Sequence, residues 1–203
     1  MSTAPSRSLS ICAKHWLQGA RHCPSPFFNA RPQGEISLSV IHNISLPPGQ
    51  FGGSYIDKLF TGQLSTQGHP YFAEIAGIEV SAHVLIRRDG ELVQYVAFDQ
   101  RAWHAGKSSY LGRDNCNDYA IGIELEGCDD QPFNDSQYDA LNALLAVLAA
   151  RYPALQGAVT GHSDIAPGRK TDPGPCFDWS RVHAAALRVE ALVGQTQPHG
   201  VKT

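Results

Sequence analysis

The chain lacks several features that would assign it to a protein class at once. Its five cysteines include no Cys-x-x-Cys pair, which disfavours a thiolate zinc site, and their odd number argues against a full disulfide framework. No apolar run reaches the roughly 18 residues of a membrane span, and residues 1–30 contain no apolar run long enough for a signal-peptide core. We therefore expect a soluble, cytoplasmic protein with reduced thiols.

An excess of basic residues is also absent. The net charge is -3, whereas a nucleic-acid-binding domain usually shows a clear basic surplus. We expect neither nucleic acid nor a membrane as a partner. A length of 203 residues with 42% hydrophobic and 17% charged residues suits one globular domain. We predict an N-terminal arm at 1–30 with Trp16, Phe27 and Phe28 as anchors, a domain at 31–193 and a flexible tail at 194–203.

Four apolar segments have the pattern of strands. Residues 36–41 alternate and then become fully apolar, so we expect a strand that enters a buried sheet and has His42 at its end. Residues 81–88 and 91–98 flank Asp89-Gly90, a dipeptide typical of tight hairpin turns. Residues 120–127 form another predicted strand.

Helical periodicity is clearest between residues 135 and 151. Apolar residues recur there every three or four positions, Asn134 or Asp135 can serve as the N-cap, and Pro153 follows the end. We also expect a short helix at 55–60, a short strand near 158–161 and a last helix from about 179 to 193, capped by Asp178.

The segment 161–175 concentrates reactive side chains in a constrained backbone. It holds His162, Asp164, Lys170 and Asp172 among three glycines and three prolines, a composition that excludes a continuous helix or a central strand. We expect a stiff loop, which would order metal ligands before an ion binds.

These residues suggest a zinc centre of the hydrolase type. Such sites use three protein ligands from His, Asp and Glu and leave the fourth position to water. His42 and His162 would supply two ligands from distant segments. Asp164 and Asp172 compete for the third place, and their spacing does not choose between them. His83 and His104 are candidates for a partner of a ligand or for a substrate contact.

Hydrolysis of an amide also needs a proton carrier and a stabiliser of the oxyanion. Glu124 and Lys170 are the candidates. Ile121, Ile123 and Leu125 share one face of their strand, so Glu124 and Glu126 lie on the other. That face is either the lining of a cleft or a solvated surface.

Four segments together resemble the type 2 N-acetylmuramoyl-L-alanine amidases, the family that includes phage T7 lysozyme and the peptidoglycan recognition proteins. The resemblance covers about residues 36–182. The segments that carry it are Val40-Ile41-His42-Asn43, Ser81-Ala82-His83-Val84-Leu85-Ile86, Ile121-Gly122-Ile123-Glu124-Leu125-Glu126-Gly127 and the loop from Gly161 to Gly174. Within the family, the chain resembles the cytosolic peptidoglycan-recycling branch through His42-Asn43-Ile44-Ser45-Leu46-Pro47-Pro48-Gly49, Arg101-Ala102-Trp103-His104-Ala105-Gly106 and Arg169-Lys170-Thr171-Asp172-Pro173-Gly174-Pro175.

The resemblance implies an α/β (α+β) fold, with a mixed central sheet flanked by helices in a single domain. It also implies one Zn²⁺ ion and cleavage of the amide between 1,6-anhydro-N-acetylmuramic acid and L-alanine in muropeptides. Separately, we expect a monomer. By the same resemblance His42, His162 and Asp172 are the zinc ligands, Glu124 is the catalytic acid/base and Lys170 stabilises the transition state.

Substrate contacts are less well defined. Asn43 and Trp103 match positions near the substrate. The relatives carry arginines that bind stem-peptide carboxylates where this chain has Glu79 and Asn115, so we consider the nearby Arg87, Arg88 and Arg113 as replacements.

Two alternatives stay open at this point: a non-catalytic peptidoglycan-binding module and a general cell-wall amidase. The first would usually lack a full ligand set, and the second would need an export signal.

Overall fold

A computed structural model of the chain describes residues 9–182, and residues 1–8 and 183–203 lie outside the described part. Its centre is a six-stranded mixed sheet. The strands, in spatial order, are β12 (Val159–Gly161), β5 (Leu38–Ile44), β11 (Ala120–Glu126), β6 (Val84–Ile86), β7 (Leu92–Gln94) and β3 (Arg21–His22). All neighbours are parallel except β6 and β7, which form an antiparallel hairpin. This architecture confirms the predicted mixed sheet with helices.

The remaining strands form three two-stranded ribbons at the margins of this sheet. Their bounds are β1 (Ser10–Ile11) with β2 (Leu17–Gln18), β4 (Phe28–Ala30) with β8 (Gln100–Ala102), and β9 (Ser109–Tyr110) with β10 (Arg113–Asp114). The first thirty residues thus contribute β1 to β4, and β3 is an edge strand of the central sheet. Strands of two residues are too short for a sequence pattern to indicate them. The proposed boundaries at 30/31 and 193/194 stay predictions.

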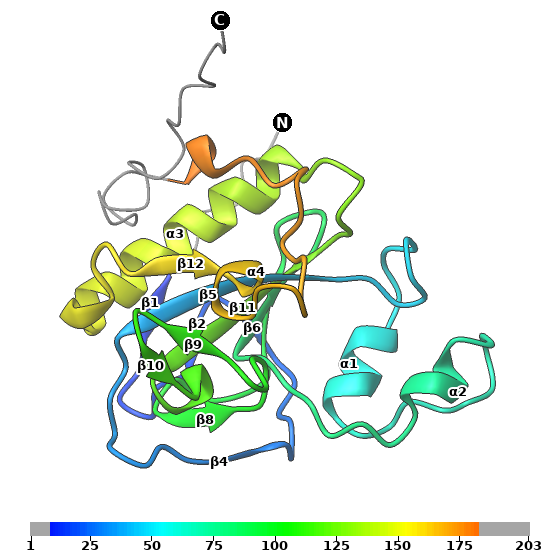
Figure 1. Cartoon of the computed structure of the whole chain (residues 1–203), viewed down its shortest axis with the longest axis horizontal. Helices are drawn as coiled ribbons and strands as arrows, with labels where there is room; N and C mark the ends of the chain where they lie inside the picture. The colour runs from blue at the N-terminus through cyan, green and yellow to red at the C-terminus, as the bar shows by residue number, and fades with distance from the viewer. Residues whose placement is uncertain (1–8, 183–203) are drawn as a thin grey trace, which may run out of the picture.

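One face of the sheet is covered by the long helix α3 (Asp135–Arg151), which Figure 1 shows lying along the strands. Its apolar stripe packs on Ile121, Ile123 and Leu125 of β11, so the odd-numbered side chains of that strand face the core. Asn134 is the N-cap, and its capping box with Gln137 satisfies the first backbone N–H groups of the helix.

The opposite face carries the shorter elements. Figure 1 shows α1 (Tyr55–Phe60) and α2 (Phe72–Ile75) set to one side of the sheet, and they pack against Leu85, Val93 and Tyr95. The one-turn helix α4 (His162–Ile165) follows β12 directly. Three short 3₁₀ turns complete the fold: η1 (Cys116–Asp118), η2 (Pro153–Leu155) and η3 (Trp179–Arg181).

The predicted elements compare well with those observed, and the differences have local causes. The strand expected at 36–41 runs from Leu38 to Ile44, so His42 lies inside it rather than at its end. The hairpin around Asp89-Gly90 is confirmed, and Gly90 has a positive φ of 88°. The expected stiff loop at 161–175 begins with the helical turn α4, which is too short for periodicity to reveal.

At the C-terminal end, Asp178 caps η3, because its side chain accepts a hydrogen bond from the Ser180 N–H. Most of the helix predicted for 179–193 lies outside the described residues. All five cysteines are described and none forms a disulfide, as expected. Within residues 9–182 we find no helix with the length and apolarity required to cross a membrane.

Candidate active site

The register of two parallel strands places a histidine beside a glutamate. Strands β5 and β11 pair so that His42 lies opposite Glu124. Both side chains point away from α3, because each is one position removed from residues that pack on that helix. Both are also buried, with 2% and 8% of their surface exposed. The face that carries Glu124 is therefore an enclosed wall and not a solvated surface.

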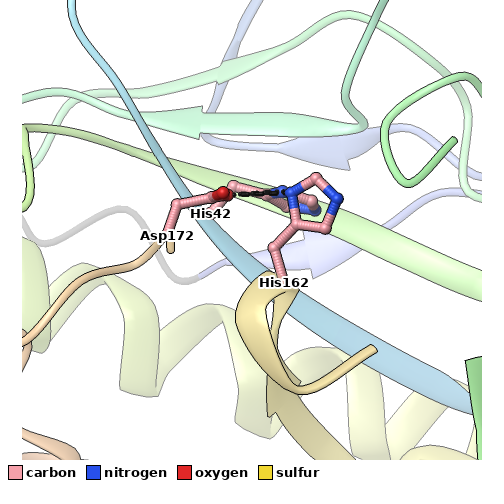
Figure 2. A group of neighbouring side chains, drawn as sticks. All are labelled: His42, His162 and Asp172. Carbon is pink, nitrogen blue, oxygen red and sulfur yellow. Dashed lines mark hydrogen bonds and ion pairs between the residues drawn. The ribbon is translucent and has the colours of Figure 1, made fainter. Parts of the chain in front are cut away.

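Two further polar side chains reach His42 from the segment after β12. His162 is the first residue of α4, and β12 pairs with β5, so the sheet brings this histidine alongside His42. The chain then folds back so that the carbonyl of Asp172 accepts a hydrogen bond from the Ser163 N–H. Figure 2 shows the three side chains converging on one point from β5, α4 and the loop.

The convergence is tight. The Nδ1 atoms of His42 and His162 lie 2.9 Å apart, and the Oδ2 atom of Asp172 lies 3.1 Å from the first and 2.9 Å from the second. These three residues form the one group of possible metal ligands found within residues 9–182. Asp172, rather than Asp164, therefore joins the two histidines.

The hydrogen bonds around His162 test whether these residues fit a cation. Its Nε2 atom lies 3.3 Å from the carbonyl oxygen of Ala105, which can only accept, so Nε2 donates a ring hydrogen to it. The Nδ1 atom faces the carboxylate oxygen of Asp172 at 2.9 Å. A ring nitrogen and a carboxylate oxygen at this distance share a positive centre, which is either a proton on the ring or a metal ion. Two imidazole nitrogens and one carboxylate oxygen are a donor set typical of zinc.

The protonation states of His42 and Asp172 also suit a metal site. Burial lowers the pKa of His42 to about 4, although Asp172 opposes the shift, so this imidazole is neutral at pH 7 and offers a lone pair. Burial alone would raise the pKa of Asp172. The adjoining imidazoles outweigh burial and hold the pKa of this carboxyl well below its usual range.

Asp164 has a different task. Its Oδ2 atom accepts hydrogen bonds from the Gly161 N–H at 2.8 Å and from the Thr160 hydroxyl at 2.9 Å. The carboxylate thus closes the start of α4, where backbone N–H groups lack partners within the helix. This contact positions His162, which is the first residue of the turn.

Glu124 has the surroundings of a proton carrier. Burial and the nearby charge of Asp172 raise the pKa of this carboxyl well above its ordinary value, while Lys170 opposes the shift. Its Oε2 atom is buried and has no hydrogen-bond partner among the described residues. Such a carboxyl binds a proton more readily than an exposed one, and its Oε2 atom is free to bond a ligand.

The site opens into a cavity of about 710 Å³. One wall is polar and includes His42, Glu124, Lys170 and Asp172. The other is largely apolar, with residues from α1, α2 and their flanking loops: Leu46, Leu59, Phe60, Tyr71, Ile75, Ile78 and Val80. A cavity with one polar and one apolar wall suits a ligand that is itself polar at one side.

Two predicted substrate contacts, Asn43 and Trp103, lie in this cavity lining. The Nδ2 group of Asn43 donates to Asp129 Oδ1 at 2.7 Å and to the Pro173 carbonyl at 3.0 Å, so both of its hydrogens are used inside the protein. Its amide holds the residue next to Asp172. Trp103 donates from Nε1 to Asn29 Oδ1 and its ring stacks near Phe27.

The predicted arm therefore supports the cavity wall through Phe27 and Asn29. Of the other aromatic residues expected to anchor it, Trp16 contacts His22 within the same segment and Phe28 is 42% exposed.

The structure does not bring the predicted arginines into this cavity. The buried Arg87 donates to Glu126 Oε1 at 3.2 Å and lies near Asp57 and Glu91, around a separate depression. Arg113 pairs with Glu35 at 2.8 Å and lies over the ring of Tyr119. The geometry gives no support to either as a substrate contact. Glu126 belongs to the Arg87 network, although it shares a strand face with Glu124.

The sequence does not decide whether His104 is a partner of a metal ligand or a substrate contact. His104 lines the cavity, and its Nδ1 atom lies 3.0 Å from Nε2 of His42. His83 instead bonds to the Gly122 N–H, the Gln100 carbonyl and Arg31. The Trp103-His104-Ala105 segment was recognised as part of a motif, but no spacing rule could place it against His42.

Comparisons with known proteins agree with this geometry. A family model described as N-acetylmuramoyl-L-alanine amidase matches residues 32–175. The chain is 62% identical over 170 residues to the 1,6-anhydro-N-acetylmuramyl-L-alanine amidase AmpD of Enterobacter cloacae, covering 83% of this chain and 91% of that one.

Solved structures give the same picture. The crystal structure of a Se-Met AmpD derivative is similar with a TM-score of 0.84 and 58% identity, over 87% of this chain and 99% of that one. A complex of the amidase AmiD from E. coli with anhydro-N-acetylmuramic acid-L-Ala-D-gamma-Glu-L-Lys has a TM-score of 0.58 and 25% identity, over 97% of this chain and 76% of that one.

Proposed function

Because the chain belongs to the N-acetylmuramoyl-L-alanine amidase family, we propose that it is a zinc-dependent enzyme that hydrolyses the amide between 1,6-anhydro-N-acetylmuramic acid and L-alanine of muropeptides. The observation that carries this proposal is the convergence of His42, His162 and Asp172 beside the buried Glu124 in one cavity. The names of the relatives and the anhydromuramyl peptide in the AmiD complex support the choice of substrate.

His42, His162 and Asp172 would hold the zinc ion. When bound, zinc supplies Lewis-acid activation of water and of the amide carbonyl. The protein contributes a rigid frame for this chemistry, because the ligands come from a central strand, from a helical turn closed by Asp164 and from a loop held by Asn43.

Glu124 acts as the general base and then as the general acid. Its raised pKa favours return of a proton to the leaving amine of L-alanine, and the carboxylate form removes a proton from the attacking water. Lys170, which lines the same cavity, donates from its ammonium group to the oxygen that becomes negative in the tetrahedral intermediate.

A purely binding role is the alternative from another class. All five proposed groups lie around one cavity, and a binding module has no need for a buried carboxyl without a partner beside a metal site. We also propose that the protein acts in cytoplasmic peptidoglycan recycling and that it is a monomer.

The test is incubation of the purified chain with anhydro and non-anhydro muropeptides, with and without a chelator. We expect release of the peptide from the anhydro substrate, loss of activity on chelation and recovery on addition of zinc. Activity that survives complete metal removal would contradict the zinc mechanism. Equal cleavage of both substrates would favour a general cell-wall amidase.

A further inference from the structure

One two-residue segment contacts both proposed histidine ligands on the side away from the metal position. The Nδ1 atom of His104 lies 3.0 Å from Nε2 of His42, and the carbonyl of Ala105 lies 3.3 Å from Nε2 of His162. In both ligands Nδ1 faces Asp172 and the proposed metal position, so a zinc ion bound at Nδ1 leaves the ring hydrogen on Nε2. The segment therefore offers one acceptor to each ligand.

This segment is itself firmly held. The side-chain oxygen of Asn117 accepts hydrogen bonds from the His104 N–H at 3.1 Å and from the Ala105 N–H at 2.8 Å. Asn117 is 6% exposed, and its own carbonyl accepts a hydrogen bond from the buried Arg31. Two successive N–H groups on one oxygen fix both the direction of the His104 side chain and that of the Ala105 carbonyl.

The sheet also makes room for the His104 ring. A Cβ atom at Gly122 would lie 2.4 Å from Cγ of His104, so only glycine at this position of β11 admits the imidazole. The contact with His42 is the only hydrogen bond of this ring among the described residues, since its Nε2 atom is buried without a partner. The fold therefore places the His104 ring so that its Nδ1 atom contacts Nε2 of His42.

We propose that His104 and Ala105, held by Asn117, are positioning residues that fix the Nε2–H tautomers of His42 and His162 and so direct both Nδ1 lone pairs at the metal. This inference rests on the proposed zinc function. Neutral imidazole exchanges its hydrogen between two nitrogens, and an acceptor at one of them selects the tautomer and orients the ring. Loss of such a partner typically lowers metal affinity about 10- to 100-fold.

The tests compare two variants of the same shape. In His104→Asn an amide oxygen can take the place of Nδ1, whereas His104→Leu has the same branching without an acceptor. Zinc affinity of the full chain is measured by competition with a chelator, and the absorption spectrum of the Co²⁺-loaded protein reports ligand geometry. We expect His104→Leu to bind zinc about 10- to 100-fold more weakly and to show an altered Co²⁺ spectrum, with His104→Asn close to wild type.

Wild-type zinc binding serves as the reference. If the wild-type chain binds no zinc, the proposed function fails first. If it binds zinc and His104→Leu binds it equally well with an unchanged Co²⁺ spectrum, only the positioning role is overturned.

A second measurement needs no substitution. In the zinc-loaded wild-type chain, ¹⁵N chemical shifts of the histidine rings distinguish protonated from bare nitrogens. We expect hydrogen on Nε2 of His42 and Nε2 of His162, and a bare Nδ1 on His104. Hydrogen on Nδ1 of His104 would overturn the proposal even if the leucine variant failed to fold.

Discussion

Replacement of Glu124 by glutamine separates chemistry from metal binding. The change keeps the shape of the side chain and removes its ability to exchange a proton. Glu124 is not among the three converging ligands, and its Oε2 atom has no partner among the described residues that the substitution could disturb. We therefore expect Glu124→Gln to fold and to bind zinc like the wild type.

The loss of turnover should be large. General acid–base catalysis by one positioned side chain contributes about 10²- to 10⁴-fold, so kcat should fall by about that factor. Zinc content and kcat are measured on the same preparation with an anhydromuropeptide substrate. A Glu124→Gln enzyme with zinc and with more than about a tenth of wild-type turnover would refute the assignment of Glu124 as proton carrier.

Stability against pH gives an independent check on the same residue. The folded chain raises the pKa of Glu124 above its ordinary value of 4.5, so its contribution to stability is complete below that value and is lost as pH rises through the folded pKa. In metal-free protein, Glu124→Gln should gain stability relative to wild type as pH rises, by at most about 1.4 kcal/mol per pH unit for one proton. Urea unfolding with chelator present measures it, and parallel curves would contradict the raised pKa.

Glu126→Gln is the matched control, two residues away on the same strand face. Glu126 is 2% exposed and accepts hydrogen bonds from Arg87 and from the Gly52 N–H. We expect a stability loss of about 3 kcal/mol, at the lower end for a broken buried ion pair because Asp57 stays 3.6 Å from Arg87. Turnover per folded molecule should be unchanged, so the two variants should show opposite effects on stability and catalysis.

Five further substitutions, one of them a control, test the neighbouring assignments. Asp172→Ala should lose zinc, whereas Asp164→Ala should retain it and lose about 1 kcal/mol of stability through the missing cap; metal analysis and thermal melts of both decide this. Lys170→Ala should lower kcat by about 10²-fold with zinc retained, and Lys107→Ala, at an exposed lysine outside the cavity lining, should leave kcat unchanged in the same assay. Asn43→Ala should destabilise the metal-free chain by about 1–2 kcal/mol in urea unfolding, because it removes hydrogen bonds to Asp129 and Pro173.

Periodicity predicted the parts of the fold that repeat over many residues. Helix α3 was expected from residue 135 to 151 and is observed at Asp135–Arg151, since five turns of apolar spacing leave little ambiguity. Strand β11 likewise matched its alternation. The two-residue strand β3 and the single turn α4 were missed, because two to four residues cannot establish a period.

Charged residues were harder to place than apolar ones. The sequence predicts Arg87 and Arg113 as substrate contacts because they lie near Glu79 and Asn115, where relatives carry arginines. A long guanidinium side chain, however, pairs with whichever carboxylate the fold brings near. The surroundings of Glu126 were equally hard to predict from the sequence. Alternation put it on the face of Glu124, yet two residues along a strand cover about 7 Å, which is enough to leave one environment and enter another.

The roles of the two carboxyls in the cavity follow from their surroundings and not from their residue type. Asp172 has an imidazole nitrogen on either side within 3.1 Å, and its pKa is held down. Burial and the charge of Asp172 raise the pKa of Glu124, whose Oε2 atom has no hydrogen-bond partner among the described residues. Ionised Asp172 thus has two effects: it is a proposed metal ligand, and its charge helps to raise the pKa of Glu124. It follows that Asp172→Asn should lower the pKa of Glu124 as well as weaken zinc binding, an effect that titration of Glu124 in the metal-free variant by ¹³C NMR would reveal.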